Sequence, residues 1–160
     1  SSLKYLSPTQ RRREAEKLSR YLSVETSDQL MMQTKQVRAL HNAGMDIGGH
    51  TVNHPILTRV DNATARAEIA DGRDALESIV GGRVSLFAYP NGRPRLDYNV
   101  DHVNIVKQLG FSAAVSTASG AARASDDPYQ LPRFAPWDEA TARLVMRLLK
   151  NYRESAAAQV

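Results

Sequence analysis

The chain has 160 residues, of which 42% are hydrophobic, so it can bury a sizeable core, and no apolar run approaches the ~18–20 residues of a membrane span. The absence of cysteine excludes disulfides and thiolate metal sites, which leaves histidine and carboxylate as the ligand chemistry. The net charge of +4 comes from basic residues interleaved with acids, which argues against a nucleic-acid partner, and the composition leaves the compartment undecided.

The first predicted element is a helix that runs from Pro8 to about Leu22. Ser7 suits the N-cap, Pro8 suits the first helical position and Gln10 completes a capping box. The run Arg11-Arg12-Arg13 is followed by acidic residues at helical spacing, so a solvated face with ion pairs is favoured over a nucleic-acid patch. Residues 1–26 are therefore predicted to be an N-terminal basic helix and linker.

The next elements alternate between helix and strand. Thr34 is predicted to cap a short helix that runs through Ala43, and the segment 46–50 then forms a strand that ends at His50. In barrels and open α/β enzymes, the carboxyl ends of strands carry the chemistry. A helix over residues 63–80 follows, and the nearly continuous apolar run 84–89 is typical of a strand that is covered on both faces.

The alternation continues in the second half of the chain. A helix over residues 100–109 carries His102, which is predicted to lie on the surface, and residues 113–117 form a further strand. A loop with a short strand near residues 131–134 precedes a final helix over 138–153, and residues 138–160 are predicted to be a C-terminal helix and tail. Strands alternating with helices, with motifs at successive strand ends, predict an α/β fold with parallel strands that form part of a (β/α) barrel.

The segment His50-Thr51-Val52-Asn53-His54-Pro55 carries the strongest chemical signal. Gly48-Gly49 and Pro55 confine it to one isolated turn after a strand, and residues four apart in such a turn face the same way. Neutral imidazole is a common zinc ligand, so His50 and His54 are candidates to hold a divalent metal. The alternative is a capped turn in which one histidine satisfies backbone groups and the other lies at the surface.

Three segments in order resemble the polysaccharide deacetylase family, the group with the NodB homology domain. They are H-T-x-x-H-P at residues 50–55, F-A-Y-P-N-G at residues 87–92 and G-F-S-A-A-V-S-T at residues 110–117. The resemblance covers roughly residues 30–137, and a partial NodB-like core is predicted over residues 27–137. It implies a distorted, partly open barrel similar to a TIM barrel, of which this chain supplies about half.

The resemblance also implies roles for individual residues. His50 and His54 would be the metal ligands, with zinc as the expected ion, and the Thr51 hydroxyl would brace the turn between them. Tyr89 would be catalytic through its backbone N–H, which would hold the oxyanion of the tetrahedral intermediate. Trp137 either lines the sugar groove or belongs to the core. The residues assigned to the substrate side of the site are Thr51, Phe87, Pro90 and Trp137, with Phe87 packed beneath the loop that Pro90 fixes.

The chain departs from the family pattern in three places. The family's first motif, T-F-D-D-G, supplies an aspartate base and an aspartate ligand, but no Asp-Asp-Gly occurs in this sequence, where Asp126-Asp127 precedes Pro128. The closing L-x-x-H supplies a general acid in many members, whereas the segment from Leu131 ends in Phe134. The arginine of the usual third motif is replaced by Ala88.

The function implied by the resemblance is metal-dependent hydrolysis of N-acetyl groups from an amino-sugar polymer, a bacterial activity of carbohydrate metabolism. The missing first motif leads us to expect a C-terminal portion of the domain that is inactive alone. We expect it to associate with the missing N-terminal half of the same domain or with itself. The alternatives are a protein that has lost its base and binds without catalysis, and a basic module that binds carbohydrate or nucleic acid.

Overall fold

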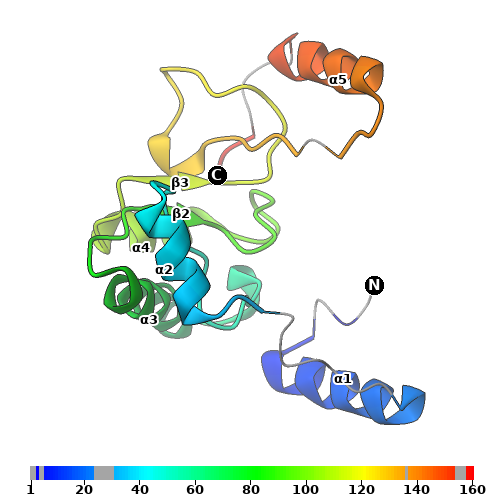
Figure 1. Ribbon diagram of the computed structural model, residues 1–160, viewed down its shortest axis with the longest axis vertical. Coiled ribbons are helices and arrows are strands. Elements are labelled where there is room, and N and C mark those ends of the chain that lie inside the picture. The colour runs from blue at the N-terminus through cyan, green and yellow to red at the C-terminus, as the bar shows by residue number, and fades with distance from the viewer. Residues whose placement is uncertain (1–2, 4–5, 24–30, 136, 154–157) are drawn as a thin grey trace.

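The computed structural model describes residues 3, 6–23, 31–135, 137–153 and 158–160. Its centre is a parallel sheet of three strands in the order β1-β2-β3 (Figure 1). Phe87 of β2 lies between Gly49 of β1 and Ala114 of β3, and Leu131 extends the sheet by one parallel bridge to Val115. The predicted α/β class with parallel strands is confirmed, and the strands that the structure describes form an open sheet. The strand bounds are β1 Gly48–Gly49, β2 Leu86–Ala88 and β3 Ala113–Val115.

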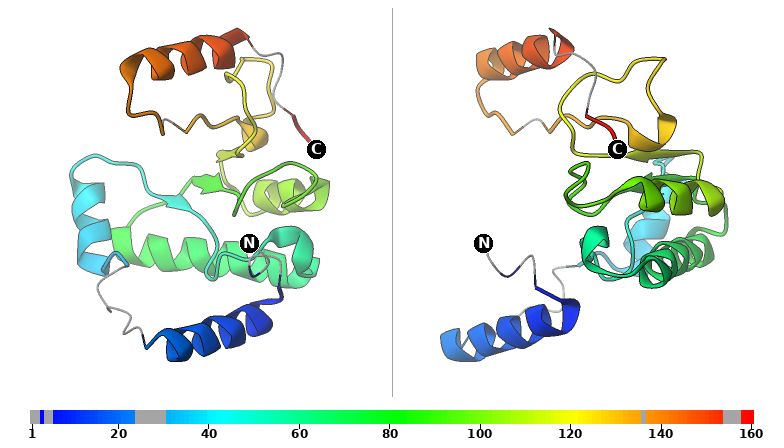
Figure 2. Two further views of the ribbon diagram at one scale, coloured as in Figure 1. Left: turned by 90° about the vertical axis from the view of Figure 1, so that its right-hand side faces the viewer. Right: turned by 180° about the vertical axis from the view of Figure 1, so that it is seen from behind.

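Helices connect these strands and cover the sheet. The α3 helix joins β1 to β2 and packs against α2 and α4, and α4 joins β2 to β3. Figures 1 and 2 show these three helices gathered at the sheet, whereas α1 and α5 lie at opposite ends of the molecule. The bounds are α1 Pro8–Leu22, α2 Thr34–Asn42, α3 Asn62–Val80, α4 Val100–Gln108 and α5 Thr141–Arg153, with 3₁₀ turns η2 Leu57–Arg59 and η3 Pro128–Gln130.

The helices begin where side chains satisfy their first N–H groups. Ser7 and Gln10 form the predicted capping box of α1. Asp61 caps α3 by accepting from the Thr64 N–H at 2.8 Å, and Asn99 caps α4. The prediction that Thr34 caps the next helix is wrong, because Thr34 is the first residue of α2 and Gln33 is its N-cap. None of the described helices combines the length and apolar character that a membrane crossing requires.

The core beside the sheet is rich in aromatic rings. The rings of Tyr89 and Tyr98 stack with their centroids 3.9 Å apart, and the Phe87 ring lies 5.3 Å from both Tyr89 and Phe111. Such aromatic pairs stabilise a fold beyond the area that they bury. The buried residues of this core are Leu57, Ala65, Ile69, Val84, Phe87, Tyr89, Tyr98, Val103, Ile105, Val106, Phe111 and Ala114.

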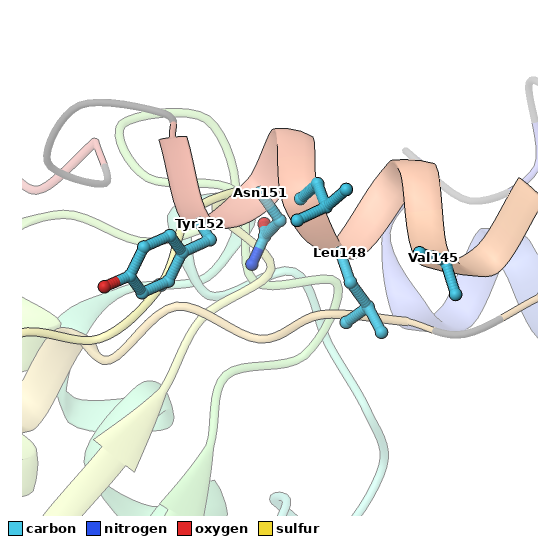
Figure 3. A pocket seen from close by; sticks show the side chains of 6 residues that line it. Val145, Leu148, Asn151 and Tyr152 are labelled. Atoms are coloured by element: carbon cyan, nitrogen blue, oxygen red, sulfur yellow. The ribbon is translucent and has the colours of Figure 1, made fainter.

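The α5 helix contributes little to this core, because no side chain along it is fully buried. Figure 3 shows Val145, Leu148 and Tyr152 projecting from the same side of the helix, and they line a cavity of about 400 Å³. One hydrogen bond, from the Gly120 N–H to Asn151 Oδ1 at 2.8 Å, ties α5 to the loop after β3. The helix therefore presents an apolar face that the described residues leave open.

Two predictions about burial are wrong. His102, predicted at the surface, is only 1% exposed, because its Nδ1 accepts from the Asn99 N–H at 3.0 Å and this turns the ring toward the core. Leu86, predicted to be covered on both faces of its strand, is 38% exposed, because among the described residues only one face of β2 is covered. Burial lowers the pKa of His102, since a charged ring would have to leave water.

We predict that His102 makes the fold sensitive to acid. Its pKa in the folded state lies below the ordinary value of about 6.5, so the unfolded chain protonates first as the pH falls. The stability that the neutral ring contributes is therefore present above that pH and is lost as the pH falls toward the folded pKa. Urea unfolding at pH 7.5 and 5.5 should show a larger loss in the wild-type chain than in His102→Gln, in which an acceptor is kept at the helix N-terminus without a titrating ring. Equal losses in the two proteins would contradict this prediction.

Candidate metal site

The turn from His50 to His54 begins directly after β1, at the carboxyl end of the sheet. Thr51 has φ 64° and His54 has φ 52°, so both residues occupy the left-handed region that non-glycine residues rarely adopt. The His54 N–H donates to Thr51 Oγ1 at 3.1 Å, which is the bracing contact expected of this hydroxyl. Because such backbone conformations cost on the order of 1–3 kcal/mol each, the turn depends on contacts that hold it in place.

The turn brings the two imidazole rings together. Their centroids are 4.7 Å apart and the rings meet edge to face. His50 is partly buried, and its Nδ1 lies 2.7 Å from the carbonyl oxygen of Ala88 at the end of β2. A carbonyl oxygen only accepts hydrogen bonds, so Nδ1 of His50 carries the hydrogen and Nε2 keeps a lone pair that could bind a metal ion.

This geometry fits a shared divalent ion. Two imidazoles that bind one tetrahedral zinc at about 2.1 Å bring their ring centres to roughly 5 Å, close to the observed separation. Across the parts of the chain that the structure describes, no group of three or more histidine, cysteine or acidic side chains is placed to hold a metal. A catalytic zinc usually takes three protein ligands, so the metal role of His50 and His54 stays a prediction that needs a third ligand.

An acidic residue that was not singled out in the sequence contacts the same turn. Glu68 of α3 accepts from the N–H groups of Val52 at 3.0 Å and Asn53 at 2.8 Å through Oε2, and from Asn53 Nδ2 at 2.7 Å through Oε1. Arg11 of α1 also contacts this turn, because its Nη2 donates to the Asn53 carbonyl at 3.1 Å. The contacts of Glu68 span 15 and 16 residues of sequence, and no local pattern marks them.

The loop after β2 holds Tyr89 by its backbone and by its phenol. The Tyr89 N–H donates to the Val115 carbonyl at 3.1 Å, and the phenol donates to the Tyr129 carbonyl at 3.0 Å. Burial raises the pKa of this phenol well above its usual range, so it stays protonated. An N–H in a sheet hydrogen bond has no second hydrogen to offer an oxyanion. The predicted role of Tyr89 stays a prediction, and it requires this bond to open.

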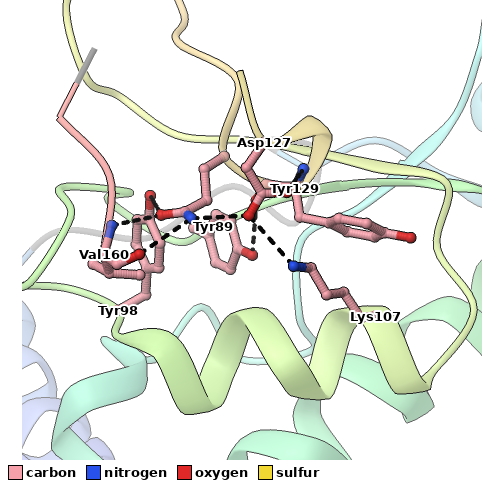
Figure 4. Close-up of polar contacts among 7 residues, drawn as sticks. Tyr89, Tyr98, Lys107, Asp127, Tyr129 and Val160 are labelled. Atoms are coloured by element: carbon pink, nitrogen blue, oxygen red, sulfur yellow. Dashed lines mark hydrogen bonds and ion pairs between the residues drawn. The ribbon is translucent and has the colours of Figure 1, made fainter. Parts of the chain in front are cut away.

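The polar network around that phenol is structural. Figure 4 shows Tyr98, Lys107 and Asp127 gathered near Tyr89. Tyr98 Oη donates to Gln130 Oε1 at 3.5 Å, Gln130 Nε2 donates to Asp127 Oδ2 at 3.1 Å, and Lys107 pairs with the same oxygen at 3.4 Å. Burial raises the pKa of Tyr98 to about 12, so its phenol is also protonated at neutral pH. Asp127, the second aspartate of the only Asp-Asp pair, therefore pairs with a lysine and an amide.

A buried aspartate holds the segment after the Pro90 loop. Asp97 is fully buried, and its Oδ2 accepts from the Arg93 N–H at 3.0 Å and from Arg93 Nε at 3.2 Å. The N-cap of α4 is Asn99, so Asp97 does not cap that helix. The carboxylate instead closes the turn between residues 93 and 97.

The residues predicted on the substrate side of the site differ in how buried they are. Phe87 is 2% exposed and packs on Tyr89 and Phe111, so it is a core residue, as expected of a ring packed beneath the Pro90 loop, and its assignment to the substrate side stays a prediction. Pro90 is also fully buried. Trp137 is 83% exposed, so it does not belong to the core. It lines a cavity of about 650 Å³ together with Thr117, Ser119, Arg133, Phe134, Ala135, Arg147 and Asn151.

Comparison with known proteins points in one direction. Residues 14–114 match the family model described as polysaccharide deacetylase. YxkH of Bacillus subtilis (strain 168), whose name refers to the same family, is 25% identical over 99 residues, which are 62% of this chain and 34% of YxkH. The deacetylase PplD of Streptococcus pyogenes, solved in complex with acetate, gives a TM-score of 0.68 at 26% identity and covers 80% of this chain and 54% of PplD.

A third relative supports the fold alone. The polysaccharide deacetylase BC0361 of Bacillus cereus gives a TM-score of 0.62 at 19% identity, and the match covers 76% of this chain and 37% of BC0361. This chain thus spans about a third of YxkH, about half of PplD and about a third of BC0361.

Proposed function

Because this chain belongs to the polysaccharide deacetylase family, we propose that it carries the histidine part of a metal site that hydrolyses N-acetyl groups of an amino-sugar polymer. The observation that carries the proposal is the pair of rings 4.7 Å apart, with one ring oriented by a strand-end carbonyl. His50 and His54 would hold a divalent ion, and zinc is the ion we expect from two imidazoles in a chain without cysteine. A bound zinc ion supplies Lewis-acid polarisation of the amide carbonyl.

The residues of this chain orient that site. The Ala88 carbonyl keeps the hydrogen of His50 on Nδ1, and the Thr51 hydroxyl closes the turn that carries His54. Trp137 offers an exposed indole beside a cavity with two arginines, which suits contact with the face and hydroxyls of a sugar ring. The Tyr89 N–H would serve an oxyanion only in a state in which its bond to Val115 has opened.

We assign the proton-accepting carboxylate and the third ligand to a segment outside these 160 residues, since they contain no Asp-Asp-Gly. We also propose that this segment completes a (β/α) barrel around the three-stranded sheet. The open apolar face of α5 and the exposed Leu86 support a packing partner of this kind, either that segment or a second copy of the chain. The 160 residues alone would then bind metal and release no acetate.

Two assays test this function. Acetate release from N-acetylglucosamine oligomers should require zinc and should occur with the complete gene product but not with the 160 residues alone. Binding of the 160 residues to the same oligomers should be lost with a chelator and should change little with salt. Binding that falls steeply with salt and survives the chelator would instead favour a basic polymer-binding module.

A further inference from the structure

We propose that Glu68 is the positioning residue of the histidine turn: its carboxylate holds the turn backbone on α3 so that the rings of His50 and His54 face one another. This inference rests on the proposed function of the pair as metal ligands. It adds a residue that touches neither ring and acts through the chain between them.

The contacts of Glu68 converge on the middle of the turn. Both of its oxygens are used, one by the backbone N–H groups of Val52 and Asn53 and the other by the Asn53 side chain, at 2.7–3.0 Å. Hydrogen bonds to an ionised acceptor are stronger than those between neutral groups. Three such hydrogen bonds tie the middle of the turn to one carboxylate.

The turn needs a support of this kind. Thr51 and His54 both have positive φ, and the Thr51 hydroxyl braces only the inside of the turn. The central N–H groups of Val52 and Asn53 point outward, where Glu68 accepts them. The strained conformation is therefore held by the Thr51 hydroxyl inside the turn and by the Glu68 carboxylate outside it.

The α3 helix is a rigid support for the Glu68 carboxylate. It is 19 residues long, and Ala65 and Ile69 on it are fully buried in the core. One turn beyond Glu68, a Cβ at Gly72 would lie 3.0 Å from the Thr51 carbonyl carbon, so helix and turn are in direct contact. A carboxylate on this helix therefore fixes the turn relative to the sheet that carries His50.

A second glutamate on α3 provides a matched control. Glu77 accepts from the Val84 N–H at 2.9 Å, a carboxylate contact to a backbone N–H of the same kind, at the start of the segment that leads into β2. Glu77→Ala removes such a contact without touching the histidine turn. Glu68→Gln keeps one oxygen that can accept from Val52 and Asn53 but removes the charge.

The experiment measures ring proximity and zinc affinity in the same proteins. In the metal-free chain, we expect a nuclear Overhauser contact between the ring protons of His50 and His54 in the wild type, Glu68→Gln and Glu77→Ala. The contact should be lost in Glu68→Ala, and zinc affinity should fall about 10- to 100-fold in that variant alone. The thermal unfolding midpoints of Glu68→Ala and Glu77→Ala show whether any change exceeds a general loss of stability.

Three other results overturn the inference. If Glu68→Ala keeps the ring contact and the affinity, the residue positions nothing. If the ring contact and the zinc affinity fall as much in Glu68→Gln as in Glu68→Ala, the effect comes from the negative charge of Glu68 rather than from its hydrogen bonds. If Glu77→Ala loses the ring contact equally, the effect is general destabilisation. A wild-type chain that shows the ring contact but binds no zinc would contradict the proposed function and would leave the role of Glu68 in the turn to be decided by the ring contact.

Discussion

Zinc binding to this chain is expected to weaken by about 100-fold or more when His50 is replaced by alanine. Structural zinc sites with four ligands bind with roughly 10–16 kcal/mol in total, so each ligand contributes about 3 kcal/mol or more, which corresponds to two factors of ten in affinity. The strand β2 also orients the His50 ring through the Ala88 carbonyl. Competition against a chelator of known zinc affinity measures the change.

The control for this prediction is a histidine outside the site. His41 lies in the last turn of α2, where it is exposed, and His41→Ala should leave the affinity unchanged. His54→Ala should weaken binding to the same extent as His50→Ala, because in the proposed site both rings would contact one ion. Wild-type affinity in either of the two site variants would show that zinc binds elsewhere.

Phe87→Ala is expected to lower the free energy of unfolding by about 3–5 kcal/mol, the usual cost of removing a buried phenylalanine from a core. The Phe87 ring is 2% exposed and packs on Tyr89 and Phe111, so the cavity would open beneath the loop after β2. Because domains are stable by only about 5–15 kcal/mol, this single change removes a large fraction of the total. Denaturant unfolding measures it.

The neighbouring residue gives the matched comparison. Leu86 lies on the same strand but is 38% exposed, so Leu86→Ala should cost well under half as much. If Phe87→Ala left stability unchanged and weakened oligosaccharide binding instead, Phe87 would be a substrate contact and its assignment to the core would be wrong.

The elements set by local chemistry could be predicted from the sequence. Ser7, Pro8 and Gln10 determine the start of α1 within one turn, and the alternation of helices with apolar segments indicates a parallel sheet. Of the strand predicted over residues 46–50, Gly48–Gly49 forms β1, because these are the residues whose backbone pairs with β2. The burial of His102 could not be predicted in this way, because its ring turns inward when it completes the cap of α4.

The candidate site was predictable in part for the same reason. The i, i+4 spacing of His50 and His54 places both residues in one turn, so their closeness could be predicted from the sequence. The contact of His50 with Ala88 joins residues 38 positions apart in the sequence, and the contact of Glu68 with Asn53 joins residues 15 positions apart. Such contacts exist only after α3 has packed beside β1 and the strands have paired. The turn could therefore be predicted from its sequence pattern, whereas the contacts that support it could not.

The most direct test of the account is whether the two histidines share one ion. Zinc is added stepwise to protein labelled with ¹⁵N, and the imidazole nitrogen signals of all four histidines are followed. The signals of His50 and His54 should shift together and saturate at one equivalent, while those of His41 and His102 stay unchanged. A shift of only one of the pair, or separate saturation of the two rings, would contradict a shared metal site.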